Sequence, residues 1–526
     1  MKIKYIGVLL IALGFIACES DDSTTMDEVQ VDLSAGSADF SNYVALGASF
    51  TAGYTDGALF MASQGNSFPN ILSQQFSALG SGEFTQPLMN DNVGGLLLGG
   101  NVIANPRLFF NGAGPAVLPA MPSTEVSNVI AGPYSNMGVP GAKSFHLLAN
   151  GYGDVGGVAT GQANPYFARM ASSANASMLE DALAQAPTFF TLSEVGGNDV
   201  LGFATSGGSG VDQTGNFDPT TYGSNDITDP NVFAQTFTAL VGALTGSGAK
   251  GVVTNVPYVT SLPYFTTIPY APLDPTNPDF GPQIPVLNAT FAPLNQAFAF
   301  LGVPERSIVF SETAASPVVI FDESLPDISA QLFPVLQAGG LDPLTAQLLS
   351  AQFAQSRQAT AEDLLVLTSS SVIATLNEEY FNQLITLGVP AATAGQLAVN
   401  GVTYPLEDRW VLTSSEENSV RVATDAYNVT IENVASSSGL ALVDLNGILQ
   451  QASTTGITFD NFTMNTDLVF GGLVSLDGVH LTARGYALMA NKFLEAIDAT
   501  YGSNFIEAGK VAKANNYPVT YSPELQ

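Results

Sequence analysis

Runs of consecutive apolar residues recur along the chain and predict strands that are buried on both faces. Four such runs are rich in β-branched and aromatic residues and lack strict alternation with polar ones; they cover residues 43–46, 187–192, 252–256 and 440–444. Strands of a parallel sheet have this pattern because helices cover both of their faces. The runs therefore predict a central parallel sheet.

Helical periodicity appears between and after these runs. Apolar residues recur at helical spacing over 420–434, and Ser414 and Glu417 precede them at the spacing of a capping box. A second apolar stripe covers 488–497 and follows Thr482, a residue type that favours the N-cap position. Strands that alternate with helices predict an α/β fold.

Long stretches interrupt this alternation. Residues 93–116 are glycine-rich and predict a loop, 200–235 form a polar loop, 258–295 are rich in proline and aromatics, and 325–400 are apolar and helical. We interpret 258–410 as one large, mainly helical insertion that caps the carboxyl edge of the sheet. The predicted division is a main domain over 40–260 and 410–505, an insertion over 261–409 and a C-terminal tail over 506–526.

The first residues indicate export. Lys2 and Lys4 precede a short apolar run that ends before Cys18, the only cysteine, so residues 1–17 predict a signal peptide. The run and Cys18 resemble a bacterial lipobox, although the residues at 15–17 depart from its usual triplet. The alternative is an ordinary secretory signal with an unpaired thiol. Under the lipobox interpretation, Cys18 carries the lipid that anchors the protein to the outer membrane.

Residues 19–39 contain seven acidic side chains and no basic one. This acidic tether after Cys18 resembles the export signal of surface-exposed lipoproteins, so we expect a surface location. With one cysteine, the exported domain must fold without disulfides.

Composition excludes several classes of protein. Hydrophobic residues make up 46% of the 526, enough for a large core, so a disordered or fibrous chain is excluded. Only 14 basic residues oppose 46 acidic ones, which gives a net charge of −32. This field repels phosphate backbones and excludes nucleic acid as a partner. The oligomeric state stays open.

Serine-based ester hydrolysis needs a nucleophile, a base and a carboxylate that orients the base. The chain has two histidines, and one of them, His480, follows Asp477 at a spacing that lets the carboxylate reach the imidazole. Ser49 lies at the end of the first predicted strand in a Gly-x-Ser sequence. Taken singly, each signal has an ordinary structural explanation, since such an Asp often caps a helix and such a serine often closes a turn.

The order of the motifs resembles that of the SGNH, or GDSL, hydrolase family. Four blocks occur in the family's order, namely Gly47-Ala48-Ser49, Asn136-Met137-Gly138-Val139-Pro140-Gly141, Gly196-Gly197-Asn198-Asp199 and Asp477-Gly478-Val479-His480. The resemblance covers residues 42–260 and 410–500 and leaves most of 261–409 unexplained. It implies a flavodoxin-like three-layer α/β/α sandwich around a parallel sheet.

The resemblance also implies a role for each block. Ser49 would be the nucleophile, His480 the general base and Asp477 its orienting carboxylate. The oxyanion hole would consist of the Ser49 and Gly141 N–H groups and the Asn198 amide. Within the second block Gly138 competes with Gly141, which we prefer from its offset from Asn136.

Three further residues, in or near these blocks, are expected to have other roles. The family's usual Asp before the nucleophile is Ala48 here, which puts full activity in doubt. We expect Asp199 to have a structural or hydrogen-bonding role, and His146 to lie on the rim of the site or in the core.

The sequence has no His or Cys cluster with metal-ligand spacing and no nucleotide-binding loop, so we expect no metal and no cofactor. Its scattered carboxylates leave a calcium site open without locating one. We expect a serine esterase that acts on acyl or acetyl esters of lipids or glycans. The alternatives are an inactive surface protein that binds glycan or lipid, and a structural surface-layer lipoprotein.

Overall fold

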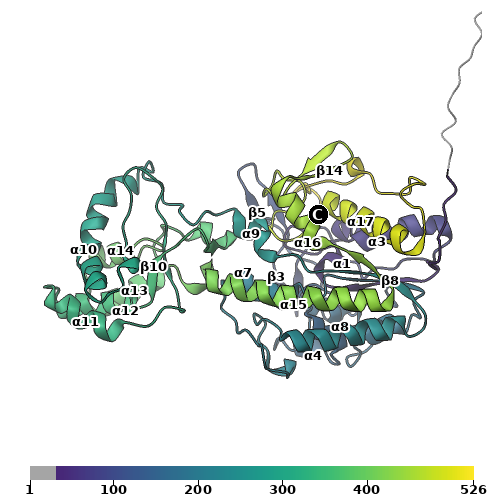
Figure 1. Cartoon of the computed structure of the whole chain (residues 1–526), viewed down its shortest axis with the longest axis horizontal. Helices are drawn as coiled ribbons and strands as arrows, with labels where there is room; N and C mark the ends of the chain where they lie inside the picture. Colours follow the sequence, from purple (N-terminus) through teal and green to yellow (C-terminus); the bar gives the residue numbers. More distant parts are fainter. Residues whose placement is uncertain (1–30) are drawn as a thin grey trace, which may run out of the picture. The chain divides into compact units, whose positions relative to one another are not determined.

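The computed structural model describes residues 31–526 (Figure 1). The predicted signal peptide and Cys18 lie outside these residues. Within the described range, no helix combines the length and the apolar character needed to span a bilayer.

A five-stranded parallel sheet forms the centre of the fold, with strand order β13-β8-β7-β1-β6. Its strands are β1 (Tyr43–Gly47), β6 (Asn136–Gly138), β7 (Phe189–Ser193), β8 (Lys250–Thr254) and β13 (Ala441–Val443). All four predicted runs correspond to strands of this sheet, which confirms the α/β class and the parallel sheet. The three-residue strand β6 was not predicted.

Side chains on the two faces of the sheet enter two different cores. On β1, Val44 and Leu46 belong to one core, whereas Tyr43 and Ala45 belong to the other. The first core also contains residues of α6 (Met178–Leu183), α7 (Asn198–Thr205), α8 (Pro230–Thr245) and α15 (Ser414–Ser438). The second contains residues of α3 (Phe68–Phe76), α16 (Leu445–Thr454) and α17 (Ala483–Tyr501). Helices on both faces are compatible with a three-layer α/β/α arrangement.

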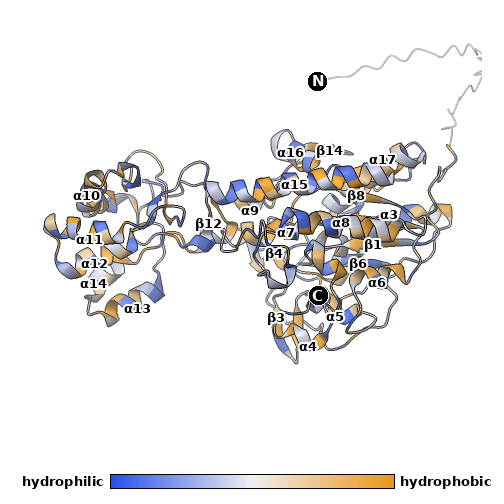
Figure 2. Ribbon diagram, turned by 60° about the horizontal axis from the view of Figure 1, so that its bottom comes forward, coloured by the Kyte–Doolittle hydropathy of each residue, from blue (hydrophilic) through white to orange (hydrophobic). Residues whose placement is uncertain are grey.

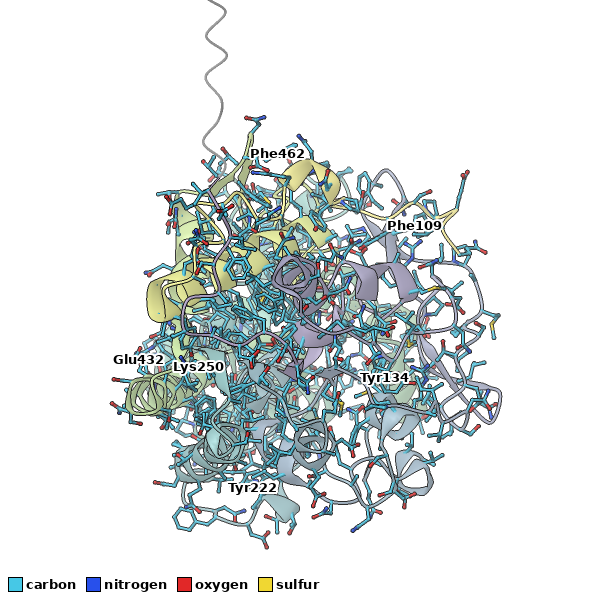
Figure 3. The ribbon with its side chains drawn as sticks, turned by 90° about the vertical axis from the view of Figure 1, so that its right-hand side faces the viewer. Phe109, Tyr134, Tyr222, Lys250, Glu432 and Phe462 are labelled. Atoms are coloured by element: carbon cyan, nitrogen blue, oxygen red, sulfur yellow. The ribbon has the colours of Figure 1, made fainter. Side chains whose placement is uncertain are left out.

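The covering helices are amphipathic. Figure 2 shows hydrophobic and hydrophilic residues mixed along α15 and α17. On α15, Val420, Tyr427 and Ile431 are buried, whereas Glu432 is exposed and labelled at the surface in Figure 3. The 3.6-residue period therefore places one face of each helix on the sheet.

The structure confirms the predicted N-cap of α17 and corrects the one predicted for α15. Thr482 caps α17 as predicted, and its hydroxyl accepts a hydrogen bond from the Gly485 N–H at 2.9 Å. The predicted capping box of Ser414 and Glu417 is wrong by one residue. Ser414 is already helical, and Glu416 accepts hydrogen bonds from the backbone N–H and the hydroxyl of Thr413, each at 2.7 Å.

Shorter elements complete the main domain. Its small helices are α1 (Ser49–Ala52), α2 (Met61–Gly65), α4 (Val155–Val158) and α5 (Pro165–Met170). The short helix α9 (Pro263–Thr266) begins the predicted insertion and packs on the first core through Phe265. Antiparallel pairs are β2 (Leu96–Leu98) with β3 (Asn101–Ala104), β4 (Leu108–Phe110) with β5 (Pro115–Val117), and β14 (Ile457–Phe459) with β15 (Phe462–Met464). The glycine-rich stretch 93–116, expected to be a loop, thus contains two hairpins, with glycines at the left-handed φ values that tight turns need.

Residues of the predicted insertion build a core of their own. Its helices, grouped together in Figure 1, are α10 (Ile284–Phe300), α11 (Ser329–Ala338), α12 (Pro343–Gln352), α13 (Glu378–Thr386) and α14 (Ala391–Leu397). The strands are β9 (Val319–Phe321), β10 (Ser356–Gln358), β11 (Leu364–Leu365) and β12 (Val411–Leu412). Phe291, Ile320 and Leu332 lie in this core, which is separate from the two cores of the sheet.

Candidate active site

Asp477 and His480 form a hydrogen-bonded pair. The His480 Nδ1 and Asp477 Oδ2 atoms are 2.8 Å apart. The other oxygen, Oδ1, accepts hydrogen bonds from the backbone N–H groups of Val479 and His480, each at 2.9 Å. Burial alone would raise the pKa of Asp477, but the adjacent imidazole and these hydrogen bonds hold it well below its usual value. An ionised Asp477 fixes the ring with Nε2 free to accept a proton.

The imidazole of His480 lies against Phe50 and Tyr54, two aromatic residues that follow Ser49 in the sequence. Its ring centroid is 4.6 Å from that of Tyr54 and 5.8 Å from that of Phe50. The N–H of Gly57, in the same segment, donates to Asp477 Oδ2 at 2.8 Å. Segments more than 400 residues apart in sequence therefore meet at one place. In the described chain no hydrogen bond joins the Ser49 hydroxyl to His480, a contact that in free enzymes often forms only with substrate.

Ser49 is the first residue of α1 and follows β1 directly. It is 7% exposed. A Cβ on Gly47 would lie 2.3 Å from the Thr51 hydroxyl and 2.6 Å from the Ser193 carbonyl oxygen, so this close turn requires glycine. Because α1 has only four residues, its helix dipole at Ser49 is small.

Glu194 supplies a carboxylate near Ser49, where Ala48 leaves none. Its Oε1 accepts hydrogen bonds from the N–H groups of Ala48 at 2.7 Å and Thr51 at 3.1 Å, and Ser193 donates to Oε2 at 2.8 Å. Burial raises the pKa of Glu194 to about 7, although these hydrogen bonds oppose the rise. Its φ of +47° is in the left-handed region, which costs free energy for a non-glycine residue. Sequence reasoning missed this residue.

The predicted oxyanion donors follow strands adjacent to β1. Gly47 pairs with Gly138 of β6 on one side and with Ser193 of β7 on the other, so the chain leaves all three strands at the same edge. The Asn198 side chain donates to the Ala142 carbonyl oxygen at 2.9 Å, which leaves its second amide hydrogen available.

The two glycines of the second block differ in what their N–H groups can do. The buried Gly138 donates its N–H to the Asn136 side chain at 3.0 Å, and a Cβ there would lie 2.2 Å from the Ala52 nitrogen. Gly141 is exposed, has a φ of +80°, and its N–H has no acceptor among the described residues. The geometry therefore favours Gly141 over Gly138 as a donor.

Asp199 is fully buried and binds the segment that follows Gly141. It accepts hydrogen bonds from the Ser144 N–H at 2.8 Å and the Ser144 hydroxyl at 2.7 Å. Burial raises the pKa of Asp199, although the bonds from Ser144 oppose the rise. These contacts fit the structural role expected for it.

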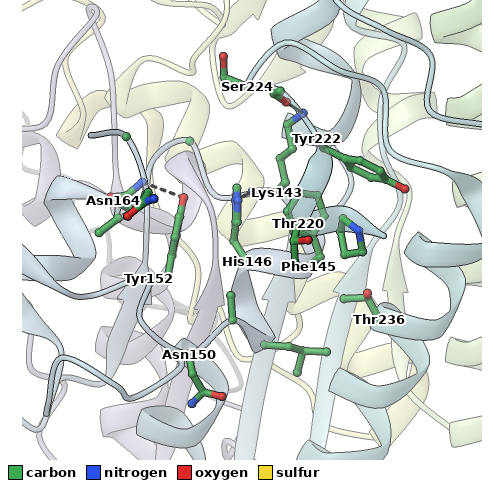
Figure 4. Close-up of a pocket in the computed structure, with 18 of the residues that line it drawn as sticks. Lys143, Phe145, His146, Asn150, Tyr152, Asn164, Thr220, Tyr222, Ser224 and Thr236 are labelled. Carbon is green, nitrogen blue, oxygen red and sulfur yellow. Dashed lines mark hydrogen bonds between the residues drawn. The ribbon is translucent and has the colours of Figure 1, made fainter. Parts of the chain in front are cut away.

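A half-open cavity of about 820 Å³ adjoins Gly141 (Figure 4). His146 lines it and stacks on Tyr152, with ring centroids 4.3 Å apart. The His146 Nδ1 atom accepts the Lys143 N–H at 3.1 Å, and burial, helped by the Lys143 charge, lowers the pKa of His146 to about 4. His146 thus lies on the wall of this cavity, where the sequence left both the rim of the site and the core open.

The rest of the lining combines small and aliphatic residues with some aromatic and amide side chains. Phe145, Tyr222, Asn150, Gln162 and Asn164 contribute to it. Asn164 donates a hydrogen bond to the Tyr152 hydroxyl at 3.1 Å, drawn dashed in Figure 4. The Asn150 and Asn164 amides donate to other groups of the chain. The exposed Gln162 amide and the aromatic rings therefore remain to contact a polar ring-shaped group such as a sugar.

Asp56 is a second buried carboxylate at the candidate site that the sequence did not reveal. It is 1% exposed, has a left-handed φ of +52°, and accepts a hydrogen bond from the Leu476 N–H at 3.1 Å. Burial and the nearby Asp477 raise the pKa of Asp56 to about 7. It therefore holds the loop of Asp477 against the segment that follows Ser49.

The insertion contacts the same loop from the other side. The Tyr264 N–H donates to the Gly478 carbonyl oxygen at 3.0 Å, and a Cβ on Gly478 would lie 2.9 Å from the Tyr264 nitrogen. Gly478 has a φ of +76°, so two constraints require glycine there.

Comparison of the chain with protein-family models, with curated proteins and with solved structures finds no match.

Proposed function

We propose that the protein is a serine ester hydrolase of the SGNH type. The observation that carries the proposal is the Asp477–His480 pair, whose imidazole packs on Phe50 and Tyr54, one and five residues after Ser49. The strand order supports it, because numbering the sheet strands along the chain gives the flavodoxin-like order 2-1-3-4-5. In such sheets ligands bind at the carboxyl ends of the strands, where Ser49 and Asn198 lie.

In the proposed reaction the Ser49 Oγ attacks the carbonyl carbon of the ester, and His480 Nε2 takes the hydroxyl proton. The N–H groups of Ser49 and Gly141 and the amide of Asn198 stabilise the oxyanion. His480 then gives the proton to the departing alcohol, which leaves an acyl-enzyme. Water activated by the same imidazole hydrolyses it, while Asp477 stabilises the imidazolium at each step.

The cavity beside Gly141 supports an acylated glycan as the substrate class. The Phe145 and Tyr222 rings provide stacking surfaces and the Gln162 amide provides a hydrogen-bonding group, which a lipid tail would leave unused. The net charge of −32 also disfavours strongly anionic substrates. We therefore propose short acyl esters, acetyl esters included, on a neutral sugar.

A fluorophosphonate probe tests the nucleophile. The wild-type chain should be labelled, whereas Ser49→Ala and His480→Ala should not. Ser436→Ala is the matched control, since Ser436 is exposed on α15 and should not affect labelling. Labelling that survives Ser49→Ala would remove this serine from the mechanism. A hydrolysis screen over acetylated sugars, p-nitrophenyl acetate and phospholipids then identifies the substrate class.

A glycan-binding protein without catalysis is the second candidate. Ala48 in place of the family's Asp favours it, as does the size of the cavity next to Gly141. This candidate predicts that the wild-type chain resists the probe but binds acetylated sugars in calorimetry, with binding weakened by Tyr152→Ala. Labelling of Ser49 would exclude it.

A further inference from the structure

We propose that Glu323, Asp408 and Glu416 form a binding site for a calcium ion that joins the insertion to the main domain. A carboxylate oxygen from each of the three lies within 4.8 Å of those of the other two. They come from three segments: Glu323 follows β9, Asp408 lies at the end of the insertion, and Glu416 is in the first turn of α15. The inference is independent of ester hydrolysis.

Two carboxylate oxygens in this cluster are buried and have no donor. They are Glu416 Oε1 and Asp408 Oδ1, and neither accepts a hydrogen bond from an N–H or hydroxyl group in the described chain. The second oxygen of each residue is used, by Thr413 for Glu416 and by Ser209 for Asp408. Glu416 is only 7% exposed, so water cannot easily replace the missing partner. A buried carboxylate oxygen without a partner is costly, and a cation removes that cost.

The backbone opposite these carboxylates is shaped to make room for them. Gly207 and Gly208, which follow α7, have φ values of +67° and +85°. A Cβ on Gly208 would lie 1.9 Å from Glu416 Oε1, and one on Gly207 would lie 2.1 Å from the Asp408 carbonyl oxygen. Only glycines at both positions leave Glu416 and Asp408 in this arrangement.

No basic side chain within the described range neutralises the cluster. The nearby Arg357 pairs with Asp322 and Asp363, and Arg409 pairs with Glu407. The three carboxylates therefore repel one another unless a cation or protons join them.

Oxygen donors alone select a hard divalent cation. Calcium binds oxygens at about 2.4 Å in flexible geometry, so two of its ligands can be about 4.8 Å apart, whereas magnesium requires about 2.1 Å and an octahedron. The three carboxylate oxygens, all within 4.8 Å of one another, therefore suit calcium better than magnesium. Bound calcium would hold the base of the insertion to α15 and to the end of α7, the helix that starts at Asn198.

The only tryptophan, Trp410, gives a direct assay because it lies two residues after Asp408. Terbium replaces calcium and emits when a nearby tryptophan, excited near 295 nm, transfers energy to it. The full chain, treated with EDTA, should show saturable emission with one terbium per chain, and calcium should displace the terbium. Emission that never saturates, or that calcium leaves unchanged, would overturn the proposal.

Three variants locate the ion. Glu323→Gln, Asp408→Asn and Glu416→Gln should each weaken terbium and calcium binding by about tenfold or more, while Glu432→Gln, on the exposed side of α15, should bind normally. Equal binding by Glu323→Gln and the wild type would refute the site. If Glu416→Gln fails to fold, Glu323→Gln decides, because Glu323 is exposed. Calorimetry with calcium chloride gives a second readout.

Discussion

Asp477 is bonded at both carboxylate oxygens, so its substitution tests orientation of the imidazole without removing the base. In Asp477→Asn an NH₂ group must face either the backbone N–H donors at Oδ1 or the Nδ1–H group at Oδ2. We expect kcat on p-nitrophenyl acetate to fall by about 100- to 10,000-fold, with KM nearly unchanged. An unchanged kcat would show that Asp477 does not orient the base.

Asn198 tests the oxyanion hole. Asn198→Ala removes one amide donor and the bond to Ala142, so we expect kcat to fall by about 100- to 1,000-fold. Asn433→Ala, on the exposed face of α15, is the matched control and should keep wild-type kinetics. A variant that loses affinity for substrate but keeps its kcat would argue against a role in the transition state.

The residues of the site differ in how visible they are in the sequence. Asp477 and His480 are three residues apart, so local spacing alone predicts their contact. Glu194 and Asp56 belong to no local motif. Their hydrogen bonds are to backbone N–H groups that are distant in sequence and lie beside them only in the folded chain.

At the level of elements, the Glu194 carboxylate ties the end of β7 to the start of α1, and this link depends on pH. Its pKa of about 7 in the folded chain exceeds the value near 4.3 of an exposed glutamate. Between about pH 4.5 and 7 the folded state therefore holds more protons than the unfolded state. The free energy of unfolding that Glu194 contributes must fall as pH rises through this window.

Glu194→Gln should remove that dependence. Glutamine stays neutral and can still accept the N–H groups of Ala48 and Thr51. We expect the difference in unfolding free energy between wild type and variant to change by up to about 1.4 kcal/mol per pH unit between pH 5 and 7. Urea unfolding at several pH values measures it. A difference that stays constant from pH 5 to 8 would contradict the raised pKa.

Elements with strong local signals could be predicted, and elements held by tertiary contacts could not. The apolar runs of β1, β7 and β13 and the Thr482 cap are local features, and the structure confirms them. Strand β6 has only three residues and depends on pairing with β1, so no periodicity marks it. The two hairpins of the glycine-rich stretch likewise were not predicted, because their many glycines indicate a loop when only composition is considered.

At the scale of the whole molecule, residues near the C-terminus are part of the packed structure rather than a loose tail. Arg107 is fully buried, and its guanidinium donates to the carbonyl oxygens of Ser522 at 2.6 Å and Leu525 at 2.9 Å. Tyr521 packs on Phe60 with ring centroids 4.9 Å apart. Removing this segment would leave a buried cation short of acceptors.

Truncation after residue 518 should therefore destabilise the chain by at least about 2 kcal/mol. Adding Arg107→Leu to the truncated chain should cost less than adding it to the full chain, because its partners are already gone. Chemical unfolding of the four chains measures both effects. Additive changes would show that Arg107 and the last residues do not interact.

The proposed lipid on Cys18 would determine where the whole molecule is located. Cys18→Ala should move the protein from the membrane fraction to the soluble fraction, because no acyl chains would remain to insert into the bilayer. Ser23→Ala, five residues later, is a control that should stay with the membrane. Membrane retention of Cys18→Ala would refute lipid attachment at this residue.

The hydrogen bond between Tyr264 and Gly478 links the insertion to the loop that carries the proposed catalytic base. Gly478 is two residues before His480, and Leu367 of the insertion lies beside it, since a Cβ on Gly478 would be 3.2 Å from the Leu367 Cδ2 atom. A displacement of this part of the insertion would therefore shift the loop that positions the His480 imidazole.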